Sequence, residues 1–246
     1  FRPATLMQMQ LDAGLLGRKV GQGFYLYEDG KAQVADEAPA PDFDGRPVWV
    51  SKLEPEAHEK LVAILHDAEA MLENGDTPSD DALILVTPIG GDATDCAVAE
   101  GLDAERTVAV DTLFGLDKRR TLMKTAVSRA DVADAAHGLL GGGDVPATVI
   151  GDTPGFIAQR AVAAICNIGC SVAQARTATP EDIDMAVVLA LNYPMGPLAL
   201  GDSIGAAMVL KILKNIHRLT GDPRYRPAPW LRRRAELGIP LTTLEA

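Results

Sequence analysis

The sequence predicts an α/β domain followed by an all-α domain, and two observations support this fold class. Between residues 47 and 150, short apolar runs alternate with helical patterns, as in a parallel sheet with helices on both faces. From 153 to 222 these runs stop, and long amphipathic helices follow one another. We therefore expect the tail of a truncated helical domain at 1–27, a linker at 28–46, the sheet domain at 47–150 and a helical domain at 151–246.

The first segment is interpreted through an internal repeat. Phe1-Arg2-Pro3-Ala4 recurs as Tyr225-Arg226-Pro227-Ala228, and in the same register Leu6-Met7 matches Trp230-Leu231. Each copy opens a short helix with a Pro and closes it with a Gly. A long helical region precedes the second copy only. We therefore expect residues 1–27 to end a helical domain whose earlier part lies outside this chain. Chance similarity between two short amphipathic helices is the alternative.

The next two segments follow from composition and from apolar runs. An extended piece, Gly23 to Tyr27, precedes a stretch rich in Ala, Pro, Asp and Glu, which we interpret as the linker. In the sheet domain we expect helices near 55–73, 93–101 and 129–140, the last with a capping box at Ser128 to Asp131. The expected strands are Val48 to Val50, Ala82 to Val86, Val108 to Val110, Thr121 to Val127 and Ala147 to Ile150.

Three helices are expected in the last segment. Phe156 to Arg176 forms one long apolar helix, and Pro180 to Leu191 forms a second, with Thr179 as its N-cap. Pro197 opens a third, whose apolar side continues to Leu219.

Composition excludes several classes of protein. A formal net charge of −11 argues against a nucleic-acid partner, and we interpret the basic run Arg232 to Arg234 as a solvated helix face. No apolar run is long enough to span a membrane, and no signal peptide is recognisable. Cys96, Cys166 and Cys170 contain no CxxC pair, so we expect no disulfide or metal site and a cytoplasmic location.

A dinucleotide-binding domain needs a GxGxxG turn between its first strand and first helix, so that the backbone can approach the pyrophosphate. Here that turn is Ser51-Lys52-Leu53-Glu54-Pro55, without a glycine. Gly90-Gly91 could in principle hold an anion, but Asp92 and Asp95 already compensate the dipole of the helix that follows. We therefore expect no cofactor-binding residue in this chain.

Catalytic groups are also missing. The four histidines each lie in a predicted helix, away from any nucleophile and without metal-ligand spacing. The long helix places the polar side chain of Gln159 on its packed face. Two interpretations stay open: Gln159 bonds the backbone of a neighbouring loop, or its amide contacts an oxygen of a ligand.

These residues resemble a known family. Asp152 to Ile157, Asn192 to Pro197 and Tyr225-Arg226-Pro227 look like successive signatures of the 3-hydroxyacyl-CoA dehydrogenase C-terminal domain, which includes 3-hydroxybutyryl-CoA dehydrogenases. Leu16 to Tyr25 is similar to the segment that ends such a domain. Long members carry two of these helical domains, with a reduced Rossmann-like domain lacking the glycine fingerprint between them. The resemblance identifies this chain with the C-terminal half of such a tandem-domain enzyme.

The resemblance implies an oxidoreductase of fatty-acid metabolism, or β-oxidation, that oxidises 3-hydroxyacyl-CoA to 3-oxoacyl-CoA with NAD. The missing N-terminal half would supply the NAD-binding domain and the catalytic His–Glu pair.

Three departures imply that this half is inactive. Gln159 replaces a family Asn, so only a vestigial substrate-binding role is expected of it. No His lies near Asp111 to Phe114, and the second copy ends in Leu241 to Leu244 without the family's Gly-rich ending. No catalytic residue, cofactor site or metal site is expected to be intact.

The expected role is therefore a non-catalytic scaffold and dimerisation half, with an acyl-CoA substrate reached only through the parent enzyme and a homo-oligomeric assembly. The alternative is a non-enzymatic interaction module, with CoA-nucleotide binding through Gly90-Gly91. A different oxidoreductase of the same plan, such as a 3-hydroxyacid dehydrogenase, is a weaker option because fold does not fix function.

Overall fold

The computed structural model describes residues 5–245, and the chain divides into two compact units, Phe1–Pro39 and Ala40–Ala246. The smaller unit contains α1 (Thr5–Asp12) and a hairpin of β1 (Leu26–Glu28) and β2 (Lys31–Gln33). Asp29 and Gly30 turn the hairpin with positive φ at both residues, which is the usual chemistry of a two-residue turn. Strand β2 lies in the stretch that we expected to be a linker. The sequence did not indicate this strand, because its residues show no alternation of apolar and polar side chains. Pro3 lies outside the described residues.

No residue between 5 and 39 is buried. Leu6 and Met7 are 56% and 59% exposed, whereas their repeat partners Trp230 and Leu231 are 3% and 0% exposed. The two copies share an apolar pattern, but only the second has a core of its own unit to pack against.

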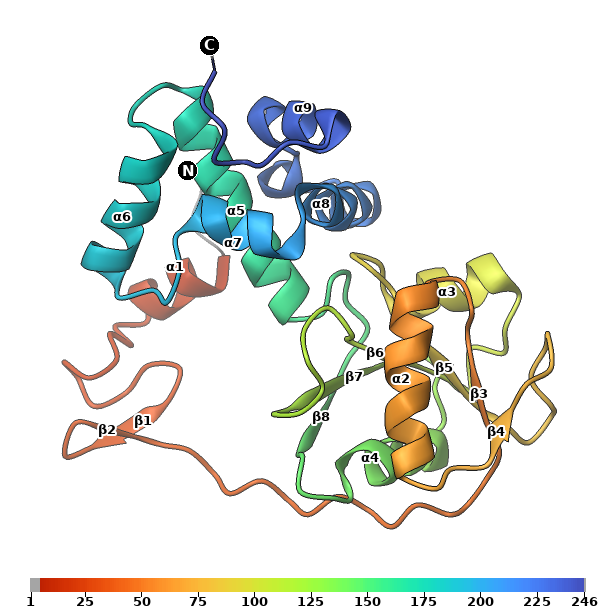
Figure 1. Cartoon of the computed structure of the whole chain (residues 1–246). Coiled ribbons are helices and arrows are strands. Elements are labelled where there is room, and N and C mark those ends of the chain that lie inside the picture. The colour runs from red at the N-terminus through yellow and green to blue at the C-terminus, as the bar shows by residue number, and fades with distance from the viewer. Residues whose placement is uncertain (1–4, 246) are drawn as a thin grey trace. The chain divides into compact units, whose positions relative to one another are not determined.

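The larger unit contains a six-stranded sheet in the order β4-β3-β5-β6-β7-β8, as Figure 1 shows. β3, β4, β5 and β6 run parallel, and β7 pairs antiparallel with β6 and parallel with β8. The strands are β3 (Val48–Val50), β4 (Leu72–Glu73), β5 (Leu83–Val86), β6 (Thr107–Val110), β7 (Arg120–Lys124) and β8 (Ala147–Ile150). The reversal follows from the connection between β6 and β7, which holds no crossover helix.

Helices cover both faces of the sheet. Alternate side chains of the strands pack under α2 (Pro55–Asp67) and α4 (Ala130–Gly141) on one face, and under α3 (Ala93–Glu100) with Phe156 on the other. This alternation follows from the two-residue period of a strand. The predicted class, a reduced Rossmann-like sheet domain followed by a helical domain, is confirmed.

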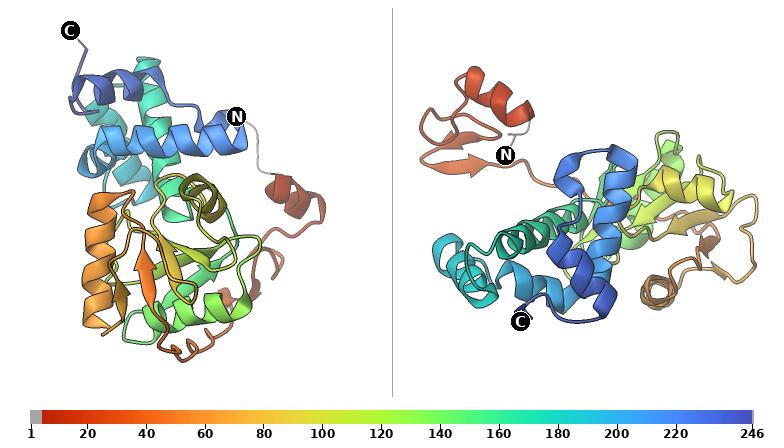
Figure 2. Two further views of the ribbon diagram at one scale, coloured as in Figure 1. Left: turned by 90° about the vertical axis from the view of Figure 1, so that its right-hand side faces the viewer. Right: turned by 90° about the horizontal axis from the view of Figure 1, so that it is seen from above.

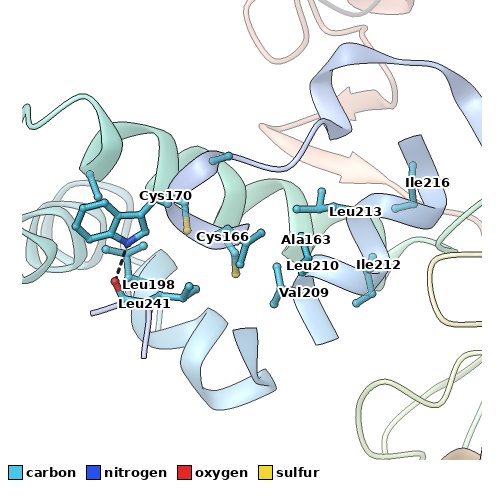
Figure 3. Close-up of a cluster of buried hydrophobic side chains, with 14 of the residues drawn as sticks. Ala163, Cys166, Cys170, Leu198, Val209, Leu210, Ile212, Leu213, Ile216 and Leu241 are labelled. Carbon is cyan, nitrogen blue, oxygen red and sulfur yellow. Dashed lines mark hydrogen bonds between the residues drawn. The ribbon is translucent and has the colours of Figure 1, made fainter. Parts of the chain in front are cut away.

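The helical region packs around one central helix, α5 (Ala158–Gln174). Cys166 and Cys170 lie on its buried face and point into the apolar cluster in Figure 3. Burial raises the pKa of each thiol to about 12, so both stay protonated at neutral pH. The other helices are α6 (Pro180–Leu191), α7 (Pro197–Ile204), α8 (Ala206–Thr220), a 3-10 turn (Pro223–Tyr225) and α9 (Pro229–Leu237).

Several expected boundaries differ from the structure. α2 ends at Asp67, six residues early, because Glu69 takes a φ of 54° and the chain turns into β4. The expected third helix is two helices, since Gly205, with a φ of 98°, ends α7 and begins α8. The predicted capping box is wrong: Ser128 accepts from the Thr125 amide and donates to the Thr107 carbonyl, so it braces the strand ends instead.

The basic run near the chain's end is also not a uniformly solvated face. Arg234 is 3% exposed, and its guanidinium lies 3.2 Å from the centroid of the Trp230 ring. The side chains are four residues apart on α9, so one turn of helix stacks them. Among the described residues, no helix is long and apolar enough to cross a membrane.

Candidate functional site

The candidate site lies at the carboxyl edge of the parallel strands. The chain leaves β3 toward β4 on one side and returns to β5 on the other, so the strand order reverses between β3 and β5. In open α/β sheets this switch point is where dinucleotides bind. In the left view of Figure 2, the long blue helix α8 lies across the sheet domain at this edge.

The turn after β3 lacks the features of a pyrophosphate cradle. The Ser51 hydroxyl donates to Glu100 at 2.6 Å, and Pro55 at the first position of α2 has no N–H to offer. The Glu54 carboxylate at the same helix end is paired with Lys211 of α8 at 2.6 Å. The crevice encloses about 90 Å³, whereas pockets for cofactor-sized ligands hold about 300–1,000 Å³. These residues do not fit a dinucleotide.

The acidic residue at the end of the second strand, which holds a ribose in dinucleotide-binding domains, has a different partner here. Glu73 ends the second parallel strand, where an acidic residue about 20 residues after the glycine turn would hold a ribose hydroxyl. Its carboxylate accepts from the amide and hydroxyl of Ser79 at 2.9 and 2.5 Å. It therefore stabilises its own loop.

The helical region instead binds the loop after β5, residue by residue. Gln159 donates to the Pro88 carbonyl at 3.1 Å and accepts from the Gly90 amide at 2.7 Å. Asn215 of α8 donates to the Ile89 carbonyl at 2.8 Å. The Gly155 amide donates to the Gly91 carbonyl at 2.9 Å. Four successive residues of this loop are thus bonded to the helical region, which we call the 88–91 contact.

Gly90 is required by this contact. Its φ is +72°, and a Cβ there would lie 2.5 Å from the Ile212 carbonyl oxygen and 2.7 Å from the Ile212 Cα. The glycine therefore allows α8 to approach the loop closely, and its amide is already bonded to Gln159. This geometry opposes the alternative in which Gly90-Gly91 binds a CoA nucleotide.

The N-terminus of α3 is bonded to carboxylates of the protein itself. The Asp92 side chain accepts from the Asp95 amide at 2.7 Å, and Asp152 accepts from the amides of Ala93 at 2.9 Å and Thr94 at 3.3 Å. Carboxylates thus occupy the N-terminus of α3, where a phosphate would otherwise be favoured. Asp152 comes from the segment that enters the helical region, so it also joins the two regions.

Gln159, the predicted substrate-binding residue, is fully buried. Besides the loop bonds it donates to Asp111 at 2.9 Å, so both of its amide hydrogens are used. These are the contacts expected if it bonds the backbone of a neighbouring loop. A contact to a ligand stays a prediction.

Asp111 is the residue that sequence reasoning did not select. It is 9% exposed at the end of β6, and its carboxylate accepts from Gln159 and from the Leu113 amide at 3.1 Å. Burial raises its pKa and outweighs the two hydrogen bonds, which lower it. Only its place after a buried strand could have indicated it.

A neighbouring cleft of about 330 Å³ is lined by Thr112, Leu113, Ile89, Met208 and the start of α2. No histidine belongs to this lining. His58 lies closest in sequence, and its ring Nδ1 is 3.0 Å from the Ser51 carbonyl oxygen. Within residues 5–245, no three His, Cys, Asp or Glu side chains are grouped so as to hold a metal ion.

Comparisons with known proteins show what the helical region is similar to. Residues 155–241 match the family model described as 3-hydroxyacyl-CoA dehydrogenase, C-terminal domain. The match runs from the turn before α5 to the tail after α9, and it contains Gln159. The helical region is therefore similar to the C-terminal domain of 3-hydroxyacyl-CoA dehydrogenases.

One relative extends the similarity to nearly the whole chain. The chain is 32% identical to 3-hydroxyadipyl-CoA dehydrogenase of Escherichia coli K12 over 238 residues, which are 96% of this chain and 44% of that protein. A probable 3-hydroxybutyryl-CoA dehydrogenase of Bacillus subtilis is 39% identical over 92 residues, or 37% of this chain and 32% of the relative. The chain thus spans less than half the length of these relatives.

Solved structures share the fold of this chain. The crystal structure of an Escherichia coli 3-hydroxybutyryl-CoA dehydrogenase superposes with a TM-score of 0.69 at 27% identity, over 96% of this chain and 44% of that one. A Ralstonia eutropha (S)-3-hydroxybutyryl-CoA dehydrogenase gives 0.58 at 22% identity, over 78% of this chain and 65% of that one, and shows the fold alone.

The 88–91 contact predicts the effect of a single methyl group. We expect Gly90→Ala to destabilise the protein by at least about 2 kcal/mol more than Gly101→Ala, measured by urea unfolding. Gly101 has a similar φ of +65° but no atom within 4 Å of its Cβ position, so it reports the backbone strain alone. Equal losses for the two variants would show that α8 does not constrain Gly90.

Asp111 predicts a pH dependence of stability. Its pKa is raised on folding, so its contribution is most favourable below the unfolded pKa of about 3.9 and is lost as the pH rises through the folded pKa. Asp111→Asn keeps an oxygen acceptor for Gln159 and Leu113 and removes the buried charge. We expect this variant to be more stable than the wild type at pH 7, with an advantage that shrinks toward pH 4.

Asp103 serves as the opposite-sign control. The side-chain hydrogen bond from Arg106 lowers its pKa, so its contribution is present above the unfolded pKa and is lost as the pH falls through the folded one. Asp103→Asn should therefore lower the free energy of unfolding at pH 7 and lose this effect in acid. Finding that Asp111→Asn behaves like Asp103→Asn would contradict the assignment of a buried, unfavourable charge to Asp111.

Proposed function

We propose that this chain is the C-terminal, non-catalytic half of a long 3-hydroxyacyl-CoA dehydrogenase and acts as a scaffold for the half that binds NAD. The observation that carries the proposal is the occupation of the sheet's carboxyl edge by the protein itself. The 88–91 contact and Asp152 use the backbone groups that a nucleotide would need.

The length of the relatives supports the same proposal. The alignment with 3-hydroxyadipyl-CoA dehydrogenase covers 96% of this chain but 44% of that enzyme, which leaves more than half of it for an NAD-binding half. The parent would oxidise a 3-hydroxyacyl-CoA to a 3-oxoacyl-CoA with NAD, in the breakdown of fatty or aromatic acids. Its reacting groups would lie in the other half, because the cleft at Thr112 has no histidine in its lining.

Exposed apolar side chains support a scaffolding role. On the smaller unit, Leu6 and Met7 are exposed, whereas their repeat partners Trp230 and Leu231 are buried. On α5 and α6, Ile168, Met185 and Leu189 are 52%, 51% and 77% exposed. Exposed apolar side chains on the two contacting helices α5 and α6 favour an interface there. We infer that the second helical domain pairs with the helical domain of the other half and that, alone, it pairs with another copy.

The proposal predicts that this chain neither binds NADH nor turns over substrate. Calorimetric titration with NADH should give no binding tighter than about 1 mM, and addition of acetoacetyl-CoA should not oxidise NADH. A complete 3-hydroxybutyryl-CoA dehydrogenase is the positive control for both measurements. A micromolar Kd for NADH would overturn the scaffold assignment, and micromolar binding of CoA alone would favour the interaction-module alternative.

The proposal also predicts self-association through α5 and α6. Sedimentation at micromolar concentration should show dimers or larger species, and Leu189→Glu should shift them toward monomer. Val98→Glu is the matched control, because Val98 on α3 is 75% exposed but lies on the sheet region. A monomeric wild type, or an equal response of both variants, would contradict the proposed interface.

The coding sequence upstream of Phe1 tests the parent's identity directly. We expect an in-frame GxGxxG about 280 residues earlier, a distance estimated from ordinary domain sizes. An in-frame stop codon immediately upstream would contradict the tandem arrangement.

A further inference from the structure

The arginines that the proposed scaffold role does not use converge on one carboxylate. Arg176 follows α5, and Arg233 and Arg234 lie on α9. Their guanidinium nitrogens lie 3.5, 3.0 and 3.8 Å from carboxylate oxygens of Glu245. In a chain with a formal net charge of −11, this is a local concentration of positive charge. Such a cluster can recognise an oxyanion.

Arg234 is held in place before any ligand arrives. Its side chain is 4% exposed and stacks on Trp230, and its Nε and Nη2 donate to the Thr243 carbonyl at 3.2 and 2.6 Å. This leaves Nη1 as the nitrogen that faces Glu245. Arg233 is also oriented, because it donates to the Gln174 side chain at 2.7 Å. Two of the three arginines are therefore preorganised, which lowers the cost of binding.

Glu245 fills this position incompletely. Only Arg233 reaches it at an ordinary hydrogen-bond distance, and the pairs with Arg176 and Arg234 are longer than charge-assisted bonds usually are. The Arg176 and Glu245 side chains are 82% and 33% exposed, so solvent weakens their attraction. The tail carboxylate is thus an occupant that an external anion can displace.

Space for such a ligand lies beside the arginines. A groove of about 480 Å³ runs between the end of α5, the start of α6 and α9. Its lining consists of Arg176, Asp182, Glu245, Ala173, Ala178, Thr179, Pro180, Trp230 and Leu244. The walls thus carry one arginine and two carboxylates beside apolar side chains, and Arg233 and Arg234 adjoin the groove through their contacts with Glu245.

We propose that this groove binds a small carboxylate or phosphate ester with an apolar portion, and that Glu245 occupies the anion position until the ligand displaces it. The oxyanion takes the hydrogen bonds of Arg176, Arg233 and Arg234. The apolar portion lies along Ala178 and Leu244. This binding site is separate from the carboxyl edge of the sheet and does not depend on the proposed function.

Calorimetry on the full chain tests the proposal with phenyl phosphate and benzoate as probes. Glu245→Gln removes the competing charge at nearly constant size, so we expect it to bind at least one probe about tenfold more tightly than the wild type does. Glu236→Gln is the matched control, since Glu236 pairs with Arg232 at 2.6 Å on the outer side of the same helix. This control should bind like the wild type.

A second variant removes the receptor. Arg176→Ala/Arg233→Ala in the Glu245→Gln background should lose at least about tenfold in affinity, and Arg234 is left intact because it packs on Trp230. Circular dichroism must show an unchanged unfolding transition. The probe that binds more tightly identifies the head group. The proposal is wrong if Glu245→Gln binds neither probe, if it binds no more tightly than the wild type, or if the arginine variant retains the affinity.

Discussion

The contact between the helical region and the loop after β5 is the interaction on which the rest of the larger unit depends. Residues 88 to 91 each use a backbone group to bind Gln159, Asn215 or Gly155. A buried polar group without a partner costs more free energy than a hydrogen bond contributes, so this set of bonds holds only when both regions are in register. The contact therefore fixes where α5 and α8 lie against the sheet.

The Rossmann-like topology depends on strand order and core packing, which are separate from nucleotide recognition. The switch point between β3 and β5 survives because it results from the strand order, which the apolar cores on both faces stabilise. Groups at this edge are bonded within the protein itself: Glu54 to Lys211, Glu73 to Ser79, and the α3 amides to Asp152. The crevice beside Glu54 encloses about 90 Å³.

The two copies of the repeated helix show how the same pattern acquires a different role from its surroundings. Trp230 is buried, and its indole N–H donates to the Leu241 carbonyl at 2.9 Å, so the second copy anchors the tail that carries Glu245. The corresponding Leu6 of the first copy is exposed. Burying an exposed apolar helix face against another surface lowers the free energy. We therefore propose that the smaller unit belongs with a helical domain outside this chain.

Sequence alone determined the fold class, the order of most elements and the absence of a glycine turn, because apolar periodicity and the requirement for small residues are local properties. It located α6 and the strands β3 and β8, whose boundaries coincide with turn residues. Tertiary structure decided the reversal of β7, the burial of Arg234 and the importance of Asp111 and Gly90. Three of these depend on a partner distant in the sequence: β8 for β7, Gln159 for Asp111 and Ile212 for Gly90. Arg234 is buried by closer residues, Trp230 and Thr243, because the chain after α9 folds back over the helix.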